Sequence, residues 1–380
     1  MMTPKSAMEA DELVLLRDSA RRFFDAEFVP HLDAWRHGAG VPRGFFHLAG
    51  TNGLLCPSVP ERYGGAGGDF RHNSVINEEM VKSGVMPAAI AVHSDIVANY
   101  ILHWGTEEQK ATLLPKMVSG EVLAAIAMTE PNAGSDLQGI RTRAVRCDGG
   151  YVIDGSKTFI TNGQNSDLIV VVAKTDPSAR ARGITLFLVD AQLQGVRRGR
   201  RLRKMGGHEQ DTSELFFESV HVPQSARLGE EGGGFAILMQ ELPRERLSIA
   251  ICAVAAAEFA LTLTVDYAKN RSAFGKPLLE FQSTAFRLAE LRAHVRMARA
   301  YVNDCLDRLM SGDLTAVDGA EAKLVTTQLQ CRVVDECLQI HGGNGWMDEY
   351  LISRLYTDAR AQRIYGGTDE VLKLVISRTL

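Results

Sequence analysis

The chain has 380 residues, of which 45% are hydrophobic and 23% charged, the composition of a globular protein with two or three domains. Its formal net charge of −4 does not favour a nucleic-acid-binding protein. The six cysteines include no CxxC pair and the ten histidines show no ligand spacing, so we expect neither a disulfide framework nor a metal site.

The first part of the chain, residues 9–120, is predicted to be helical, because apolar residues such as Leu13 and Leu16 recur at three- and four-residue steps. The glycine-rich segment 60–70 is predicted to be a loop. The N-terminal sequence has no basic region followed by an apolar core, and no apolar stretch is judged long enough to span a membrane. We therefore expect a soluble, cytoplasmic protein whose first domain, residues 1–120, is all α.

The character of the sequence changes after residue 120. Short β-rich runs separated by Gly, Asn, Asp and Pro predict an antiparallel sheet or barrel over residues 121–229. A basic cluster in this region is typical of a solvated strand edge or loop rather than a phosphate site. The cluster consists of Arg197, Arg198, Arg200, Arg201, Arg203 and Lys204. No GxGxxG follows a strand, which excludes a Rossmann nucleotide-binding fold.

Helices return in the third predicted domain, residues 230–380. Apolar residues between Leu288 and Leu309 alternate at three- and four-residue steps, which predicts the seam of an antiparallel helical bundle. A second helix, 315–341, is predicted to bury Ala322, Val325, Leu329 and Val333. Pro243 should either begin a new helix or kink an existing one. The predicted fold class is α+β, mostly α.

Several segments could carry a binding site, although each is also compatible with an ordinary turn or cap. MTEPNAGSDLQGI (128–140) follows a strand and leaves its backbone open to a planar ring or a diphosphate. GSKTFITNGQNSD (155–167) places Phe159 before an Asn-Gly turn; the alternative is a β-hairpin with this aromatic ring in its core. RSAFGKPLLEFQ (271–282) joins two helices, and QIHGGNGW (339–346) ends one.

The segment RIYGGTDEVLK (363–373) combines two glycines with a helix start at Thr368. Free N–H groups at such a turn can hold an anion or a carbonyl oxygen. The turn offers no side chain for chemistry, so the reactive group must lie elsewhere in the sequence.

In this order and at these separations, the segments resemble the acyl-CoA dehydrogenase family over nearly the whole chain. The matching motifs are TEPNAGSD, ITNG, RSAFGKPLLEFQ, HGGNG and YGGTDE. Two positions depart from the family pattern: Asn132 replaces a usual glycine, and Phe159 replaces a common tryptophan. The resemblance implies an N-terminal helical domain, a middle β-domain and a C-terminal four-helix bundle, with FAD held between the subunits of a homotetramer, a dimer of dimers.

The resemblance also implies an activity of fatty-acid β-oxidation. An acyl-CoA thioester would be oxidised to a trans-2-enoyl-CoA, and the electrons would pass to electron-transfer flavoprotein. Two alternatives stay open: a flavin-dependent acyl-CoA oxidase or monooxygenase on the same scaffold, and a non-catalytic acyl-CoA-binding protein.

Site residues follow from the resemblance position by position. The implied FAD contacts are Met128, Thr129, Gly134, Ser135, Phe159, Ile160, Thr161, Arg271, Phe274, Gln282, Gln339, Gly342, Gly343, Thr368, Asp369 and Glu370. Arg271, Phe274 and Gln282 would reach the FAD of the neighbouring subunit, as would the motif that begins at Gln339. The implied substrate contacts are Ser135, Lys174, Thr175, Arg246, Gly366 and Gly367.

The catalytic base of many family members is a glutamate at the position that Gly366 occupies in this chain. The long-chain and isovaleryl branches instead carry it on an earlier helix, and MQELPRERLSIA (239–250) resembles their motif with Glu245 as the base. Glu245 would abstract the α-proton while the β-hydride moves to flavin N5, and the Gly366 N–H would stabilise the developing enolate. Glu241, one turn earlier, is the competing candidate. Burial should raise the pKa of the base.

Overall fold

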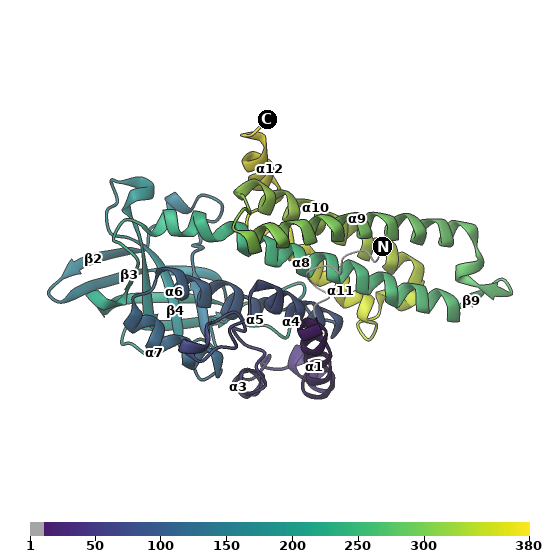
Figure 1. Ribbon diagram of the computed structural model, residues 1–380, viewed down its shortest axis with the longest axis horizontal. Coiled ribbons are helices and arrows are strands. Elements are labelled where there is room, and N and C mark those ends of the chain that lie inside the picture. The colour runs from purple at the N-terminus through teal and green to yellow at the C-terminus, as the bar shows by residue number, and fades with distance from the viewer. Residues whose placement is uncertain (1–10) are drawn as a thin grey trace.

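The computed structural model describes residues 11–380. A β-sheet from the middle of this range is flanked by helices that precede it and helices that follow it in the sequence (Figure 1). Residues 9 and 10 of the predicted N-terminal helix, and most of the segment in which no signal peptide is expected, lie outside the described residues. Within 11–120 the helical prediction is confirmed. The helices are α1 (Asp11–Glu27), η2 (Val29–His31), α2 (Leu32–His37), α3 (Arg43–Thr51), η3 (Glu61–Tyr63), α4 (Phe70–Lys82), α5 (Ala88–Ala91), the π-helix η4 (Val92–Val97), α6 (Ala98–Trp104) and α7 (Glu107–Val118).

The middle of the described chain forms a twisted sheet whose strand order is β6-β7-β3-β2-β4-β5-β8, with β1 paired to β4. The strands are β1 (Ala124–Ala127), β2 (Arg143–Cys147), β3 (Gly150–Thr161), β4 (Leu168–Lys174), β5 (Ile184–Asp190), β6 (Val196–Arg201), β7 (Thr212–Pro223) and β8 (Arg227–Leu228), with short η helices at Leu137–Gly139, Arg180–Gly183 and Gln224–Ala226. Most pairs are antiparallel as predicted, but β4 runs parallel to β1 and to the start of β2. The basic cluster begins on the edge strand β6, which confirms its interpretation as a strand edge.

The third part is a helical bundle. It consists of α8 (Gly234–Asn270), the hairpin β9 (Ser272–Ala273) and β10 (Lys276–Pro277), η8 (Leu278–Glu280), α9 (Gln282–Ser311), α10 (Ala316–His341), η9 (Gly342–Trp346), α11 (Leu351–Gln362) and α12 (Asp369–Ser377). The predicted seam of α9 is confirmed, because Leu288, Leu291, Val295, Ala298, Val302 and Cys305 are buried. On α10 the prediction is wrong for Val325, which is exposed. Pro243 lies inside α8, so a helix start at that residue is also wrong.

α8 ties the parts together. Its first turns bury Ile237 and Leu238 in a core shared with the N-terminal helices and with one face of the sheet, and its later turns form the bundle core. By length and composition α8 could cross a membrane, so the prediction that no stretch is long enough is wrong. However, 67% of its most apolar window is buried inside the protein, as expected for a core helix.

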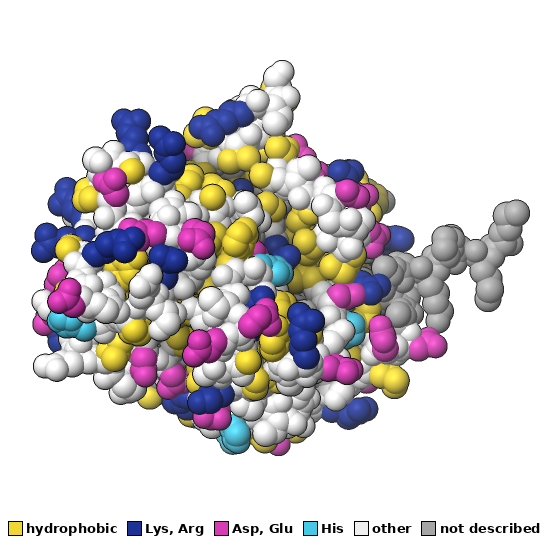
Figure 2. All heavy atoms as spheres, turned by 60° about the vertical axis from the view of Figure 1, so that its left-hand side comes forward, with side chains coloured by type: hydrophobic (Ala, Val, Ile, Leu, Met, Phe, Trp, Pro, Cys, Tyr) yellow, Lys and Arg dark blue, Asp and Glu magenta, His cyan; other side chains and the backbone are white. Residues whose placement is uncertain are grey.

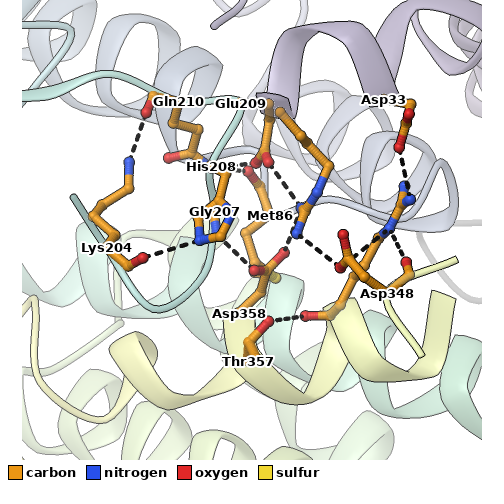
Figure 3. Close-up of polar contacts among 12 residues, drawn as sticks. Asp33, Met86, Lys204, Gly207, His208, Glu209, Gln210, Asp348, Thr357 and Asp358 are labelled. Atoms are coloured by element: carbon orange, nitrogen blue, oxygen red, sulfur yellow. Dashed lines mark hydrogen bonds and ion pairs between the residues drawn. The ribbon is translucent and has the colours of Figure 1, made fainter. Parts of the chain in front are cut away.

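A buried polar cluster joins all three parts away from this core (Figure 3). Arg36 of α2 pairs with Glu209, which lies between β6 and β7, at 3.0 Å. The Gly207 N–H of the same loop donates to Asp358 Oδ1 of α11 at 2.6 Å. Burial, reinforced by Glu209, raises the pKa of Asp358 to about 7. These contacts fix the loop between β6 and β7 against helices from both ends of the chain.

The surface has mixed character. On the face turned forward in Figure 2, apolar side chains are spread across the middle, and Lys and Arg side chains gather toward the upper left. Acidic side chains are scattered among them. Such a surface agrees with the small net charge of −4.

Candidate active site

Glu241 and Glu245, the two carboxylates singled out from the sequence, lie one turn apart on α8. Each exposes only 6% of its surface. Because both carboxylates are largely shielded from water, the groups that contact them have a strong effect on their chemistry. Their hydrogen-bond partners come mainly from α6.

Glu245 accepts a hydrogen bond from the hydroxyl of Tyr100, with 2.7 Å between Oη and Oε1. Burial raises the pKa of Glu245 to about 7, and the negative charge of Glu241 acts in the same direction. The Tyr100 hydrogen bond and the charges of Arg246 and Arg244 oppose this rise. A carboxyl group that titrates near neutrality is suited to accept a proton at physiological pH.

Glu241 is held in a different state. Its Oε1 lies 2.9 Å from both His103 Nδ1 and Trp104 Nε1, and its Oε2 accepts from Arg244 at 3.1 Å. Burial acts to raise the pKa of Glu241, but these donors and the nearby positive charges outweigh it and lower the pKa. Glu241 is therefore an ionised carboxylate with its oxygens engaged, which leaves Glu245 as the better candidate for a base.

Replacing Glu245 with glutamine should stabilise the fold at alkaline pH. The pKa of this carboxyl is about 7 in the folded chain against an ordinary 4.5, so the wild type loses stability as the pH rises from 4.5 to 7. Above pH 7 the wild type carries the full free-energy cost of burying the ionised Glu245 carboxylate, which corresponds to about 3 kcal/mol. We expect the Tm of Glu245→Gln to exceed that of the wild type at pH 8, and the gap to narrow at pH 5. A gap of equal size at both pH values would contradict the raised pKa.

The glycine turn that precedes α12 folds back onto α8. Arg246 Nε donates to the Gly366 carbonyl at 3.2 Å, a contact between residues 120 positions apart, and Lys323 Nζ of α10 donates to the Gly367 carbonyl at 2.8 Å. The two glycines have φ angles of +67° and +102°, a conformation that favours glycine. Burial lowers the pKa of Lys323 to about 8.

The turn lies over the part of α8 that carries the candidate base. A Cβ atom built on Gly366 would stand 2.5 Å from Cδ1 of Ile249, which is one turn beyond Glu245. The side chain of another residue at position 366 would therefore enter the space beside this helix. The structure thus brings together the candidate base on α8 and a glycine turn that has no side chain, two features that the sequence places far apart.

The motifs at 128–140 and 155–167 meet at one end of the sheet. The Thr158 N–H donates to the Thr129 carbonyl at 2.9 Å, so the segment after β1 runs beside the end of β3. Asn162, at the following turn, donates to the carbonyls of Ala89 and Ala124 and ties this end of β3 to the start of α5. The α5–η4–α6 segment then leads to Tyr100 and the candidate base.

Phe159 has an unusual position for a large aromatic residue. It exposes 67% of its surface and has a φ angle of +60°. The ladder between β3 and β7 is irregular between Lys157 and Ile160, and such an irregularity re-aims a side chain. Ile160 is buried instead, so the hairpin with Phe159 in its core is wrong. An exposed ring next to the half-buried Thr161 fits stacking against a planar group such as isoalloxazine.

A buried ion pair shapes the backbone of the first motif. Lys157 Nζ lies 2.9 Å from Glu130 Oε1 and 3.0 Å from the Met128 carbonyl. Glu130 also accepts the backbone N–H groups of Arg141 and Thr142 at 2.6 and 2.9 Å. Burial acts to raise the pKa of Glu130, but Lys157 and these donors lower it on balance. The segment 128–142 therefore folds back so that its C-terminal end contacts the ionised carboxylate of Glu130 near its start.

The tip of this motif is open. Gly134 and Ser135 are exposed, and a Cβ atom built on Gly134 would meet no atom of the described chain within 4 Å. A diphosphate could thus approach the backbone without a clash. Lys174 lies at the end of β4, where its N–H donates to the Thr142 carbonyl at 2.8 Å, and Thr175 contacts the hydroxyl of Thr185.

A second group of predicted cofactor contacts lies at the far end of the bundle. The hairpin that contains Arg271 and Phe274 is at the opposite end of α8 from the sheet (Figure 1). At 1.5 Å per residue, the helix from Glu245 to Asn270 is roughly 40 Å long. Gln282, Gln339, Gly342 and Gly343 are exposed, and the Phe274 side chain is almost fully exposed. One cofactor cannot contact both sets of residues within a single chain.

The last predicted contacts lie at the start of α12. Thr368 caps this helix, and Glu370 is exposed. Asp369 is buried and bound to Gln328 at 2.9 Å and to Arg363 at 2.5 Å. The Asp369 carboxylate therefore stabilises the turn, and its role as a cofactor contact stays a prediction.

The sequence reasoning missed several residues of this site. Tyr100 was not named, although a tyrosine in a buried helix usually needs a partner for its hydroxyl. Lys323 was also missed, although a lysine at a core-facing position of a helix normally has a specific contact. Glu130 and Lys157 lie in the predicted motifs but gave no signal of being paired.

Comparison with known proteins identifies relatives along the whole chain. Family models described as the N-terminal, middle and C-terminal domains of acyl-CoA dehydrogenase match residues 10–121, 125–220 and 232–380. Long-chain specific acyl-CoA dehydrogenase of Mus musculus mitochondria is 46% identical over 96% of this chain and 86% of its own length. Isovaleryl-CoA dehydrogenase of Solanum tuberosum mitochondria is 34% identical over 96% of this chain and 89% of its own length.

Solved structures of similar fold are also acyl-CoA dehydrogenases or related proteins. An acyl-CoA dehydrogenase from Geobacillus kaustophilus superposes with a TM-score of 0.97 at 46% identity, covering 99% of both chains. A glutaryl-CoA dehydrogenase from Mycobacterium smegmatis in complex with FADH2 gives 0.92 at 27% identity, covering 98% of this chain and 95% of the other. A chain from a structure of the electron transferring flavoprotein of Acidaminococcus fermentans gives 0.94 at 32% identity, covering 100% and 99%.

Proposed function

The chain belongs to the acyl-CoA dehydrogenase family, and we propose that Glu245 is the base with which it removes the α-proton of an acyl-CoA thioester. The protein is an FAD-dependent acyl-CoA dehydrogenase, an oxidoreductase of fatty-acid and lipid metabolism. Its fold has the three-part organisation of that family. We further infer that the parts fold as domains with boundaries at 1–120, 121–229 and 230–380.

One observation carries the proposed role of Glu245: a buried carboxyl with a pKa of about 7 lies beside a glycine turn that has no acidic side chain. A thioester α-C–H is too weak an acid to ionise without a base, and a base is most effective when its pKa is near the working pH. Arg246 holds the Gly366 carbonyl, and the backbone N–H of the turn is then available to the thioester oxygen.

The residues at the sheet end fit the flavin. Bound FAD supplies the acceptor for the hydride that leaves the β-carbon. Phe159 and Thr161 would lie against its ring, with Thr129 beside them, and the exposed backbone at Gly134 and Ser135 would receive its diphosphate. Lys174, Thr175 and Arg246 are proposed substrate contacts. The exposed aromatic ring and the open backbone support this assignment.

A second copy of the chain would complete the cofactor site. Arg271, Phe274, Gln282 and the segment from Gln339 to Gly343 would contact the FAD of a neighbouring subunit, in a homotetramer built as a dimer of dimers. Exposed large apolar side chains at this end of the bundle support an interface, since such residues seldom gather on a monomer. These include Phe274, Phe286 and Trp346. Electron-transfer flavoprotein is the proposed electron acceptor, and the cytoplasm the proposed location.

The experiment that tests the function is anaerobic mixing of the purified flavoprotein with a panel of acyl-CoAs. We expect the absorbance of oxidised flavin to bleach, and turnover to continue when electron-transfer flavoprotein is present. Fast reoxidation by oxygen alone would instead indicate an oxidase. Purified protein without flavin, or flavin that no acyl-CoA bleaches, would indicate a non-catalytic binding protein. Sedimentation of the same sample measures the oligomeric state.

A further inference from the structure

We propose that Tyr100 is the positioning residue for the base: its hydroxyl holds the Glu245 carboxylate in one orientation and stabilises the ionised form that accepts the proton. The inference deepens the proposed function and rests on Glu245 being the base. Tyr100 lies 145 positions away in the sequence and donates to Glu245 at 2.7 Å. It acts on the substrate only through the carboxylate.

The contact is built for a charged acceptor. Tyr100 is fully buried, and a buried phenol requires a hydrogen-bond partner. An ionised carboxylate accepts a stronger hydrogen bond from a hydroxyl than a neutral carboxyl group does. The bond therefore favours the state of Glu245 that precedes proton transfer, and it opposes the effect of burial on the same group.

The backbone before Tyr100 helps to aim it. The π-helix η4 stands between α5 and α6, and a π-helical turn holds one residue more than an α-helical turn. It therefore re-aims the residues that follow relative to those before. Asp95 in η4 and Tyr100 in α6 both contact α8: Asp95 Oδ2 accepts from Ser248 Oγ at 2.5 Å, and Ser248 lies three residues beyond Glu245.

Asp95 also fixes η4 from the other side. Its two carboxylate oxygens accept from the side-chain amides of Asn73 and Asn77 of α4, at 2.8 and 2.7 Å. The π-helical turn is thus held between α4 and α8 by buried hydrogen bonds. A donor carried on such a support loses little entropy when it orients the base, which is the condition for a preorganised site.

The titratable and charged groups around Glu245 come from two elements. They are Tyr100 on α6, Glu241, Arg244 and Arg246 on α8, and, through Glu241, His103 on α6. Glu241 raises the pKa of Glu245, whereas Tyr100 and the two arginines lower it. Removal of the Tyr100 hydroxyl alone should therefore raise the pKa of Glu245 further and leave the other groups in place.

The test is Tyr100→Phe in the flavin-loaded enzyme. Because the reaction requires ionised Glu245, the acid limb of the kcat–pH profile should move to higher pH by about one unit, with the rate largely recovered at high pH. Difference infrared spectroscopy of the carboxyl band, assigned with Glu245→Gln, should show the same shift without turnover. Tyr63→Phe is the matched control, because Tyr63 is a buried tyrosine that donates to another carboxylate, Glu107, at 2.6 Å.

The outcomes separate the two proposals. If Glu245→Gln is inactive but Tyr100→Phe moves neither the acid limb nor the infrared titration, the base role stands and the positioning role is overturned. If the kcat of Tyr100→Phe falls by the same factor at every pH and the infrared titration of Glu245 does not move, the positioning role is also overturned. If Glu245→Gln remains active while Tyr100→Phe shifts the infrared band, the proposed base fails and the contact is supported. If Tyr100→Phe does not fold, 3-fluorotyrosine can be placed at position 100 instead. Its hydroxyl is more acidic and donates a stronger hydrogen bond, so the infrared titration of Glu245 should move to lower pH. A titration that does not move overturns the proposal.

Discussion

Replacing Glu245 with glutamine is expected to lower kcat by about 10²–10⁴-fold, the usual contribution of a general base. Glutamine keeps the size of the side chain and an oxygen that can accept from Tyr100, but it cannot take the α-proton. The visible spectrum of bound flavin and the affinity for acyl-CoA should change little, because glutamine has nearly the same size and shape as glutamate. Rapid anaerobic mixing, which follows flavin bleaching in a single turnover, measures this loss directly.

Glu241→Gln is the matched control for that experiment. Glu241 is on the same helix and has the same burial, but its carboxylate is occupied by His103, Trp104 and Arg244. We expect Glu241→Gln to retain most of the single-turnover rate. The opposite pattern, with Glu241→Gln inactive and Glu245→Gln active, would move the base to Glu241.

Replacing Glu130 with alanine is expected to cost about 3–5 kcal/mol, the penalty for leaving a buried charge without its partner. Lys157 is fully buried, and burial already lowers its pKa to about 8. Without Glu130, the N–H groups of Arg141 and Thr142 also lose their acceptor. The motif at 128–140 should then lose its fixed shape, so we expect a lower Tm together with reduced flavin content in the purified protein.

Two further variants test whether the loss of stability comes from the unpaired buried charge. Glu130→Leu combined with Lys157→Met removes both charges and should recover much of the stability, because an apolar pair often replaces a buried ion pair without loss. Glu218→Ala breaks the exposed pair with Arg197 on the same sheet and should change the Tm little. A normal Tm for Glu130→Ala would show that the buried pair does not support the motif.

The order of helices and strands was readable from the sequence because it depends on local periodicity. The seam of α9 repeats apolar residues at helical spacing, and the structure buries them as predicted. The same reasoning was wrong for Val325, because α10 faces its neighbours with small and polar residues instead. These include Gly319, Ala320, Lys323, Thr326 and Thr327. Periodicity shows that a helix has a buried face, but it cannot show which polar side chains find partners there.

Sequence motifs also sufficed to identify the family and to reduce the candidate bases to two. They could not predict that Phe159 would face solvent, because that depends on an irregular register between β3 and β7. The resemblance already implied that the two sets of predicted cofactor residues serve different subunits. Their separation at opposite ends of a long helix is set by how the bundle packs against the sheet, which no motif records.

The sequence motif already favoured Glu245 over Glu241 as the proposed base, and the tertiary structure adds a physical reason for that preference. Both residues are glutamates that lie one turn apart on one helix, and each exposes only 6% of its surface. What distinguishes them is α6, which brings His103 and Trp104 to one carboxylate and Tyr100 to the other. The proton affinity of a buried carboxyl is set by the water it loses and by the charges and donors that replace that water. The donors on α6 lie more than 100 positions away in the sequence, so no local pattern records them.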